Sequence, residues 1–114
     1  MSERSHVTSH VLDSTLGRPA AGVHVTLEQH GSGRWHPIGD ATTDADGRVT
    51  ALGPVALQPG LYRVAFDTAA YFAAQQVATF YPEVQITFEL ADADAHYHVP
   101  LLLSPFAYST YRGS

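Results

Sequence analysis

The last nineteen residues of the chain, HYHVPLLLSPFAYSTYRGS (96–114), hold two histidines, an arginine, several aromatic residues and the free carboxylate of Ser114. Chain ends usually lose order and accumulate polar residues, so this terminus indicates a function. Histidine moves protons near neutral pH, and arginine can stabilise negative charge that develops during a reaction. The chain has no cysteine, and its serines lie in turns or outside a strand-to-helix elbow. These residue types therefore favour acid–base chemistry on water over a covalent nucleophile.

Three histidines stand where a β-strand would turn them away from a core. In residues 96–103 the alternation places tyrosine, valine and leucine on one face, and His96 and His98 on the other. His10 follows the same rule, because Val7 and Val11 take the inward side of its own segment. Alternation does not choose between His96 and His98, and such a pair could also bind a metal, although no third ligand stands at a characteristic spacing. The remaining histidines are expected in turns or on solvated surface: His6, His24, His30 and His36.

Alternation with a period of two dominates the chain and predicts an all-β fold. The alternating segments are residues 5–13, 22–30, 61–66, 84–90 and 96–103, separated by turns rich in glycine, proline and aspartate. Strands at this spacing, with no helix between most of them, favour an antiparallel sandwich. The alanine-rich stretch 67–79 is the exception, and it predicts one short helix capped by Asp67 or Thr68.

Length and composition limit the kinds of partner. The 114 residues fit one domain, 1–114, which is large enough for a core without disulfides. The net charge is −5, which argues against binding to a phosphate backbone. No apolar run is long enough to cross a membrane, and the polar start, residues 1–6, is unlike a signal peptide. A chain without cysteine can work in a reducing compartment. We therefore expect a soluble, cytoplasmic protein with no nucleic-acid or membrane partner.

Two further residues have both a structural and a functional interpretation. Arg48 follows the turn sequence Asp46-Gly47 and could be an exposed hairpin arginine, and Tyr111 could be a packing residue. Apolar side chains near the end of the chain, Pro105, Phe106, Tyr108 and Tyr111, extend the histidine-bearing face. Exposed apolar area beside titratable groups is typical of a surface covered by another subunit. A symmetric assembly would also explain an ordered chain end.

Three segments resemble one protein family. They are SHVLDSTLGRPA (9–20), TDADGR (43–48) and, above all, the tail 96–114. Together they are similar to the transthyretin-related proteins that hydrolyse 5-hydroxyisourate, an unstable intermediate of urate degradation. In that family the ending Tyr-Arg-Gly-Ser separates the hydrolases from transthyretin, the hormone carrier of the same fold. The resemblance runs from about Ser5 to Ser114.

The resemblance implies a fold, a site and an assembly. The fold is a transthyretin-like sandwich of two four-stranded sheets with one short helix. The site maps onto His10, Arg48 and His98 as catalytic residues, with Tyr111 and Ser114 binding the substrate. No metal or organic cofactor is implied. The partners implied are the small-molecule substrate and three further copies of the chain, in a homotetramer built as a dimer of dimers.

The implied reaction opens a cyclic amide. Water attacks a ring carbonyl of 5-hydroxyisourate, and the product is 2-oxo-4-hydroxy-4-carboxy-5-ureidoimidazoline. The histidine pair would move the proton, Arg48 would hold the anionic oxygen, and the Ser114 carboxylate would brace Arg48 or a histidine. One alternative is a transthyretin-like carrier that binds a small aromatic ligand, and another is a plain adhesion or regulatory sandwich. A carrier has no need of His10, Arg48 and His98 together, and a plain sandwich leaves the composition of the chain end unexplained.

Overall fold

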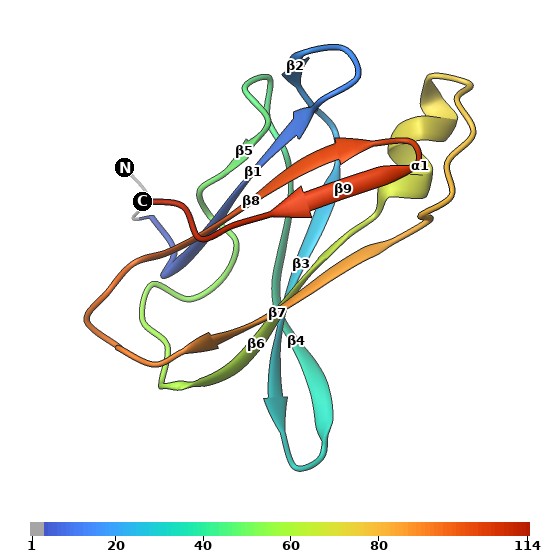
Figure 1. Cartoon of the computed structure of the whole chain (residues 1–114). Coiled ribbons are helices and arrows are strands. Elements are labelled where there is room, and N and C mark those ends of the chain that lie inside the picture. Colours follow the sequence, from blue (N-terminus) through green and yellow to red (C-terminus); the bar gives the residue numbers. More distant parts are fainter. Residues whose placement is uncertain (1–3) are drawn as a thin grey trace.

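The alternating segments form two β-sheets packed face to face (Figure 1). The structure, a computed structural model, describes residues 4–114, so part of the polar start that argues against a signal peptide lies outside it. One sheet has the strand order β2-β1-β8-β9, with β5 beside β1, and the other has the order β4-β3-β6-β7. The first sheet contains β1 (Val7–Asp13), β2 (Arg18–Pro19), β5 (Arg48–Val49), β8 (Tyr97–Ser104) and β9 (Ala107–Thr110). The second contains β3 (His24–Gly31), β4 (Arg34–Thr42), β6 (Gly60–Phe66) and β7 (Val84–Leu90). The expected transthyretin-like sandwich is confirmed, with the two-residue strand β5 as a fifth member of the first sheet.

The core lies between the sheets and follows the predicted alternation. On β8 the residues expected to face inward, Tyr97, Val99, Leu101 and Leu103, are buried, whereas His98 is only half-buried. On β1 Val7 and Val11 are buried, and His10 is partly exposed. Each strand buries one face because side chains point to opposite sides of a sheet in turn. The outward face of the first sheet therefore carries the histidines.

The pairing of β1 with β8 is parallel and joins the two ends of the chain. Thr8 lies opposite His98, and His10 lies opposite Pro100. Strand β5 pairs with the other edge of β1 in antiparallel fashion and places Arg48 opposite His10. Residues separated by about 90 positions in the sequence thus become neighbours on one face. Sequence alternation gives the face of each residue but not these partners.

The predicted helix exists and is shorter than the stretch that suggested it. Helix α1 spans Thr68–Ala74, and its N-cap is Asp67, whose carboxylate accepts a hydrogen bond from the Ala70 amide at 3.2 Å. Gln76 adopts a left-handed conformation with φ 59°. The amides of Gln76 and Val77 donate to carbonyls of the last turn, each at 3.0 Å, as in a Schellman motif. This C-terminal cap ends the helix before Thr79. No helix among residues 4–114 is long and apolar enough to cross a membrane.

The expectation of a solvated surface position is wrong for His6, which is 7% exposed. Its Nδ1 accepts a hydrogen bond from the Leu57 amide at 2.9 Å, so in the neutral ring Nε2 carries the proton and donates to the Ala95 carbonyl at 2.7 Å. Both ring nitrogens bond to the backbone of loops that close over the start of β1. Backbone partners from distant loops have no signature in the local sequence. His24, His30 and His36 are exposed, as expected.

Asp13 links the end of β1 to the following turn and to helix α1 through hydrogen bonds. Its side chain is buried, and one carboxylate oxygen accepts hydrogen bonds from the amides of Thr15 and Leu16, both at 3.0 Å. The other oxygen accepts a hydrogen bond from the Tyr71 hydroxyl at 2.7 Å. Burial, followed by the bond to Asp13, raises the pKa of Tyr71, which stays a neutral donor. One carboxylate thus satisfies three donors from two elements.

We expect Asp13→Ala to lower the free energy of unfolding by about 3 kcal/mol, because it removes the buried, charged acceptor of three hydrogen bonds. Urea unfolding at pH 7 measures this loss. Asp40→Ala is the matched control, since Asp40 pairs with His24 at the exposed surface and should cost at most about 1 kcal/mol. Equal losses in the two variants would contradict the role given to Asp13.

Candidate active site

The outward face of the first sheet brings the predicted catalytic residues together. His10 on β1 and His98 on β8 lie on adjacent strands and differ by two positions in register. Strand spacing and rise therefore place their Cα atoms about 8 Å apart. Arg48 lies on the opposite side of β1, directly across from His10. Strands β1, β8 and β5 thus place the imidazoles of His10 and His98 and the guanidinium of Arg48 on one surface.

A polar hollow of about 120 Å³ opens on this face. Arg48, His98 and Ser114 line it, so three of the five predicted site residues share one depression. Its remaining wall consists of Arg4, Thr8, Ser9, Val49, Thr50 and His96. His10 is not part of the wall and lies beside Arg48 at its edge.

The turn between residues 44 and 47 positions both Arg48 and His10. The Asp44 carboxylate accepts hydrogen bonds from the amides of Asp46 and Arg48 at 2.9 and 3.0 Å. The bond from the Arg48 amide is the main cause of the lowered pKa of Asp44, which therefore stays ionised. The Asp46 carbonyl accepts a hydrogen bond from Nε2 of His10 at 2.9 Å. A neutral His10 therefore keeps its lone pair on Nδ1. The turn chemistry read from the sequence is confirmed, and the turn also orients a candidate catalytic ring.

His98 is hydrogen-bonded through Nδ1, whereas His10 is hydrogen-bonded through Nε2. Its Nδ1 lies 2.8 Å from Oγ1 of Thr8, the residue opposite it in the parallel pair. Burial lowers the pKa of His98, and the positive charges of His10, Arg48 and Arg4 lower it further. The ring is therefore neutral, and able to accept a proton, at a lower pH than an ordinary histidine.

His96 and Thr8 complete this group. The sequence placed His96 on the outward face with His98 but gave Thr8 no role. The Thr8 hydroxyl also lies 2.9 Å from Nε2 of His96. Strand alternation left His96 and His98 equivalent, and in the structure both reach the polar hollow. The Thr8 contacts cross the parallel pair, so no local spacing in the sequence could reveal them.

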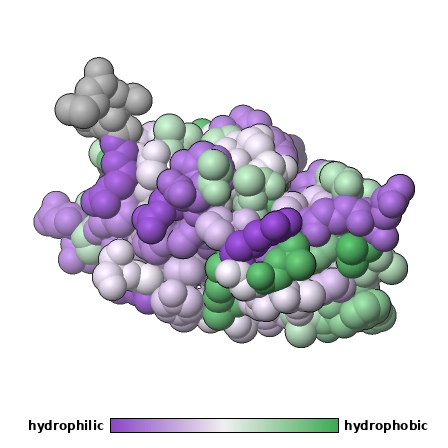
Figure 2. Space-filling model, turned by 90° about the horizontal axis from the view of Figure 1, so that it is seen from above, coloured by the Kyte–Doolittle hydropathy of each residue, from purple (hydrophilic) through white to green (hydrophobic). Residues whose placement is uncertain are grey.

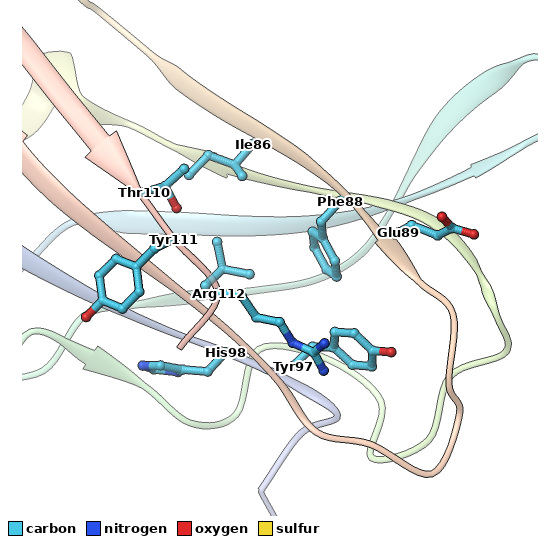
Figure 3. Close-up of a pocket in the computed structure, with 9 residues that line it drawn as sticks. Ile86, Phe88, Glu89, Tyr97, His98, Thr110, Tyr111 and Arg112 are labelled. Carbon is cyan, nitrogen blue, oxygen red and sulfur yellow. The ribbon is translucent and has the colours of Figure 1, made fainter. Parts of the chain in front are cut away.

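Tyr111 lies in a second, apolar hollow of about 270 Å³ (Figure 3). Ile86 and Phe88 of β7 form part of its wall, and the guanidinium of Arg112 lies 4.5 Å above the ring centroid of Tyr97. His98 lines both hollows. The structure thus places Tyr111 near His98 but outside the polar hollow that contains Arg48. Within the described part of the chain, no group of three or more His, Asp or Glu side chains could hold a metal ion.

Comparison with known proteins assigns the chain to a family. Residues 7–113 match the model of the HIUase/Transthyretin family. The chain belongs to this family. A 5-hydroxyisourate hydrolase of Salmonella typhimurium is 49% identical over 106 residues, which cover 92% of this chain and 78% of the relative. The solved structure of Klebsiella pneumoniae 5-hydroxyisourate hydrolase is 34% identical and superposes with a TM-score of 0.84, covering 95% of this chain and 98% of that one.

Similarity of fold extends to transthyretin as well as to 5-hydroxyisourate hydrolase. Transthyretin from Sparus aurata superposes with a TM-score of 0.86 at 32% identity, covering 96% of this chain and 97% of that one. The two TM-scores are nearly equal, so the fold does not separate a 5-hydroxyisourate hydrolase from a transthyretin. The side chains of the site must make that distinction.

Gly113, in the C-terminal sequence Tyr-Arg-Gly-Ser, packs against His98. Its amide donates to the His98 carbonyl at 2.9 Å, and the two residues form an isolated antiparallel bridge. A Cβ atom at position 113 would overlap Cδ2 of the His98 ring and press on Pro100. Glycine is required here for a close approach and not for an unusual backbone angle. The tail therefore fixes one side of the imidazole.

We expect Gly113→Ala to displace the His98 ring, because the added methyl group occupies its place. The ring signals of His98 in an NMR spectrum should shift, whereas those of the exposed His30 should not. Gly31→Ala is the control, since its Cβ would meet only Cδ2 of His36 at an ordinary 3.9 Å. Unchanged His98 signals in Gly113→Ala would show that the tail does not position this ring.

Proposed function

We propose that this protein hydrolyses 5-hydroxyisourate to 2-oxo-4-hydroxy-4-carboxy-5-ureidoimidazoline. The observation that carries the proposal is the polar hollow, in which a neutral imidazole and a guanidinium reach the same space. Family membership supports the choice of substrate, because a relative that is 49% identical is named 5-hydroxyisourate hydrolase. An imidazole and a guanidinium are the groups that hydrolysis of a cyclic amide requires.

In the proposed mechanism, water attacks a ring carbonyl carbon of the substrate. The His10–His98 pair takes one proton from the water as its oxygen bonds to carbon, and a negative charge forms on the carbonyl oxygen. Arg48 binds this oxyanion through its fixed set of N–H donors. The carbon–nitrogen bond then breaks, the histidine pair returns the proton to the leaving nitrogen, and the carbonyl re-forms as a carboxyl group. The pair ends in its starting state.

Two further residues would bind the substrate. Tyr111 lies on the side of His98 that faces the apolar hollow, where it could orient the substrate ring. Ser114 lines the polar hollow with Arg48, where it could brace the guanidinium. Neither residue has a part in proton transfer.

The proposal includes a homotetramer, a dimer of dimers, formed by one domain of residues 1–114 acting in the cytoplasm. Large apolar side chains near the end of the chain support an assembly, since Phe106 is 68% and Tyr111 59% exposed. Seen from above, hydrophobic surface gathers on one side of the molecule beside strongly hydrophilic surface (Figure 2). Such a surface is typical of a subunit interface.

The alternative is a carrier of a small aromatic ligand. The apolar hollow beside Tyr111 and the similarity to Sparus aurata transthyretin favour it. A carrier would bind an aromatic compound without consuming 5-hydroxyisourate. An assay of 5-hydroxyisourate consumption therefore distinguishes the two functions.

We expect the protein to accelerate the ultraviolet decay of freshly made 5-hydroxyisourate. His98→Ala and His10→Ala should each lower kcat, by up to about 10²–10⁴-fold for the principal base. Arg48→Ala should lower kcat by about 10²-fold and raise KM, because Arg48 also binds the ground-state oxygens. The exposed His36→Ala is the control and should match the parent. Decay at the uncatalysed rate with the parent protein would refute the hydrolase assignment.

The activity should persist at a pH below the ordinary histidine value of 6.5. Burial and neighbouring cations lower the pKa of His98, so its neutral form survives as the pH falls through 6.5. The acid limb of kcat/KM against pH reports this group in the free enzyme. Replacing Arg48 by methionine removes one of the cations and should move the limb to higher pH. A limb above pH 6.5 in the parent would contradict the role of His98.

A further inference from the structure

One hydroxyl group, that of Thr8, joins two histidine rings at the polar hollow. Oγ1 of Thr8 lies 2.8 Å from Nδ1 of His98 and 2.9 Å from Nε2 of His96. Thr8 is 4% exposed, so water does not readily replace either partner. The hydroxyl belongs to β1, and both rings belong to the segment at the start of β8.

The hydroxyl has one proton, and this fact links the two rings. Thr8 can donate to one ring only, so the other ring must donate to Thr8. If His98 donates from Nδ1, Thr8 donates to Nε2 of His96, and the proton of a neutral His96 lies on Nδ1. If His96 donates from Nε2, Thr8 donates to Nδ1 of His98, and the proton of a neutral His98 lies on Nε2. Neutral rings therefore always have the same tautomer: both Nδ1–H or both Nε2–H.

We propose that Thr8 is a positioning residue that holds neutral His96 and His98 as Nδ1–H tautomers, and so keeps Nε2 of His98 free to act as the base. This inference rests on the proposed function, because it names what orients the base of that reaction. Among the described residues Nε2 of His98 has no hydrogen-bond partner, although its ring lines the hollow. His96 acts through Thr8 as the second positioning residue.

The charges around the two rings favour this tautomer. His98 faces His10 on its neighbouring strand and Arg48 on β5, and both rings face Arg4. His96 also faces His6, and Ser114 lines the hollow with both rings. Two guanidinium groups, those of Arg4 and Arg48, line the hollow against the single carboxylate of Ser114. The excess of positive charge favours a lone pair on Nε2 of His98 over an N–H group. Burial, and then the charges of Arg4, His98 and His6, lower the pKa of His96, which keeps it neutral and able to accept from Thr8.

The arrangement also fits the proton-transfer step. When Nε2 of His98 takes a proton from water, the ring becomes an imidazolium that still donates from Nδ1 to Thr8. Thr8 still donates to His96, so no hydrogen bond has to reverse. A protonated His96 would instead donate from Nε2, turn the Thr8 hydroxyl toward His98 and place the proton of His98 on Nε2. The base would then be lost, and protonating both rings would leave the hydroxyl proton without an acceptor.

NMR of the unmodified protein tests this directly, without any assay of activity. ¹⁵N–¹H correlation spectra of the histidine rings distinguish the tautomers. We expect Nδ1–H in both His96 and His98 at neutral pH. On acidification, one ring should gain its proton well before the other. Opposite tautomers, Nε2–H in both rings, or two independent titrations would overturn the proposal.

Substitution of Thr8 tests its consequence for catalysis. Thr8→Val keeps the side-chain shape but removes the hydroxyl, so the His98 proton should move partly to Nε2. We expect kcat to fall by about tenfold, which is part of the roughly 10²–10⁴-fold that general base catalysis contributes. KM should change little. Thr8→Ser should restore both the tautomer and kcat. Thr26→Val, on the other sheet, is the control.

The outcomes separate this proposal from the proposed function. If the parent fails to hydrolyse 5-hydroxyisourate, the function is wrong, and the NMR tautomers still decide the coupling. If the parent is active but Thr8→Val keeps both its tautomer and its kcat, the positioning role is wrong and the function stands. If Thr8→Val does not fold, the tautomers of the parent and of Thr8→Ser decide the matter.

Discussion

The parallel pairing of β1 with β8 is the constraint on which the site depends. Parallel neighbours need a long connection, and here residues 14–96 lie between the two strands. Their register puts Thr8 beside His98, and β5 on the other edge of β1 puts Arg48 beside His10. A slip of one residue would turn the histidines toward the core and the valines toward solvent. The buried alternation on both strands fixes the register, and with it the site.

Backbone groups and small side chains then fix the rings within this frame. The Asp46 carbonyl holds Nε2 of His10, Thr8 holds Nδ1 of His98, and Gly113 packs against the His98 ring. Each of the two hydrogen bonds leaves the other nitrogen of its ring free. The same surroundings lower the pKa of His98, so the orientation and the protonation state of the base have a common origin. Such preorganisation is how a small site obtains acid–base catalysis.

Local alternation was sufficient to predict the faces of β1 and β8, and the alanine-rich composition of residues 67–79 predicted the position of helix α1. It missed β4 and β9, and it misplaced His6, whose partners are backbone groups of distant loops. The residues His10, Arg48, His98, Tyr111 and Ser114 were selected by resemblance and not by spacing. The structure gathers Arg48, His98 and Ser114 in one hollow and places Tyr111 in its neighbour. Thr8 had no signal in the sequence, because its role arises only from the pairing of distant strands.

The central claim is that the imidazole of His98 and the guanidinium of Arg48 act on one substrate in one hollow. A double-mutant cycle of His98→Ala and Arg48→Ala, with kcat/KM for 5-hydroxyisourate as the readout, tests it most directly. Groups that stabilise the same transition state give strongly non-additive losses. The account predicts that the double variant is little slower than the slower single variant. Losses that simply multiply would contradict it.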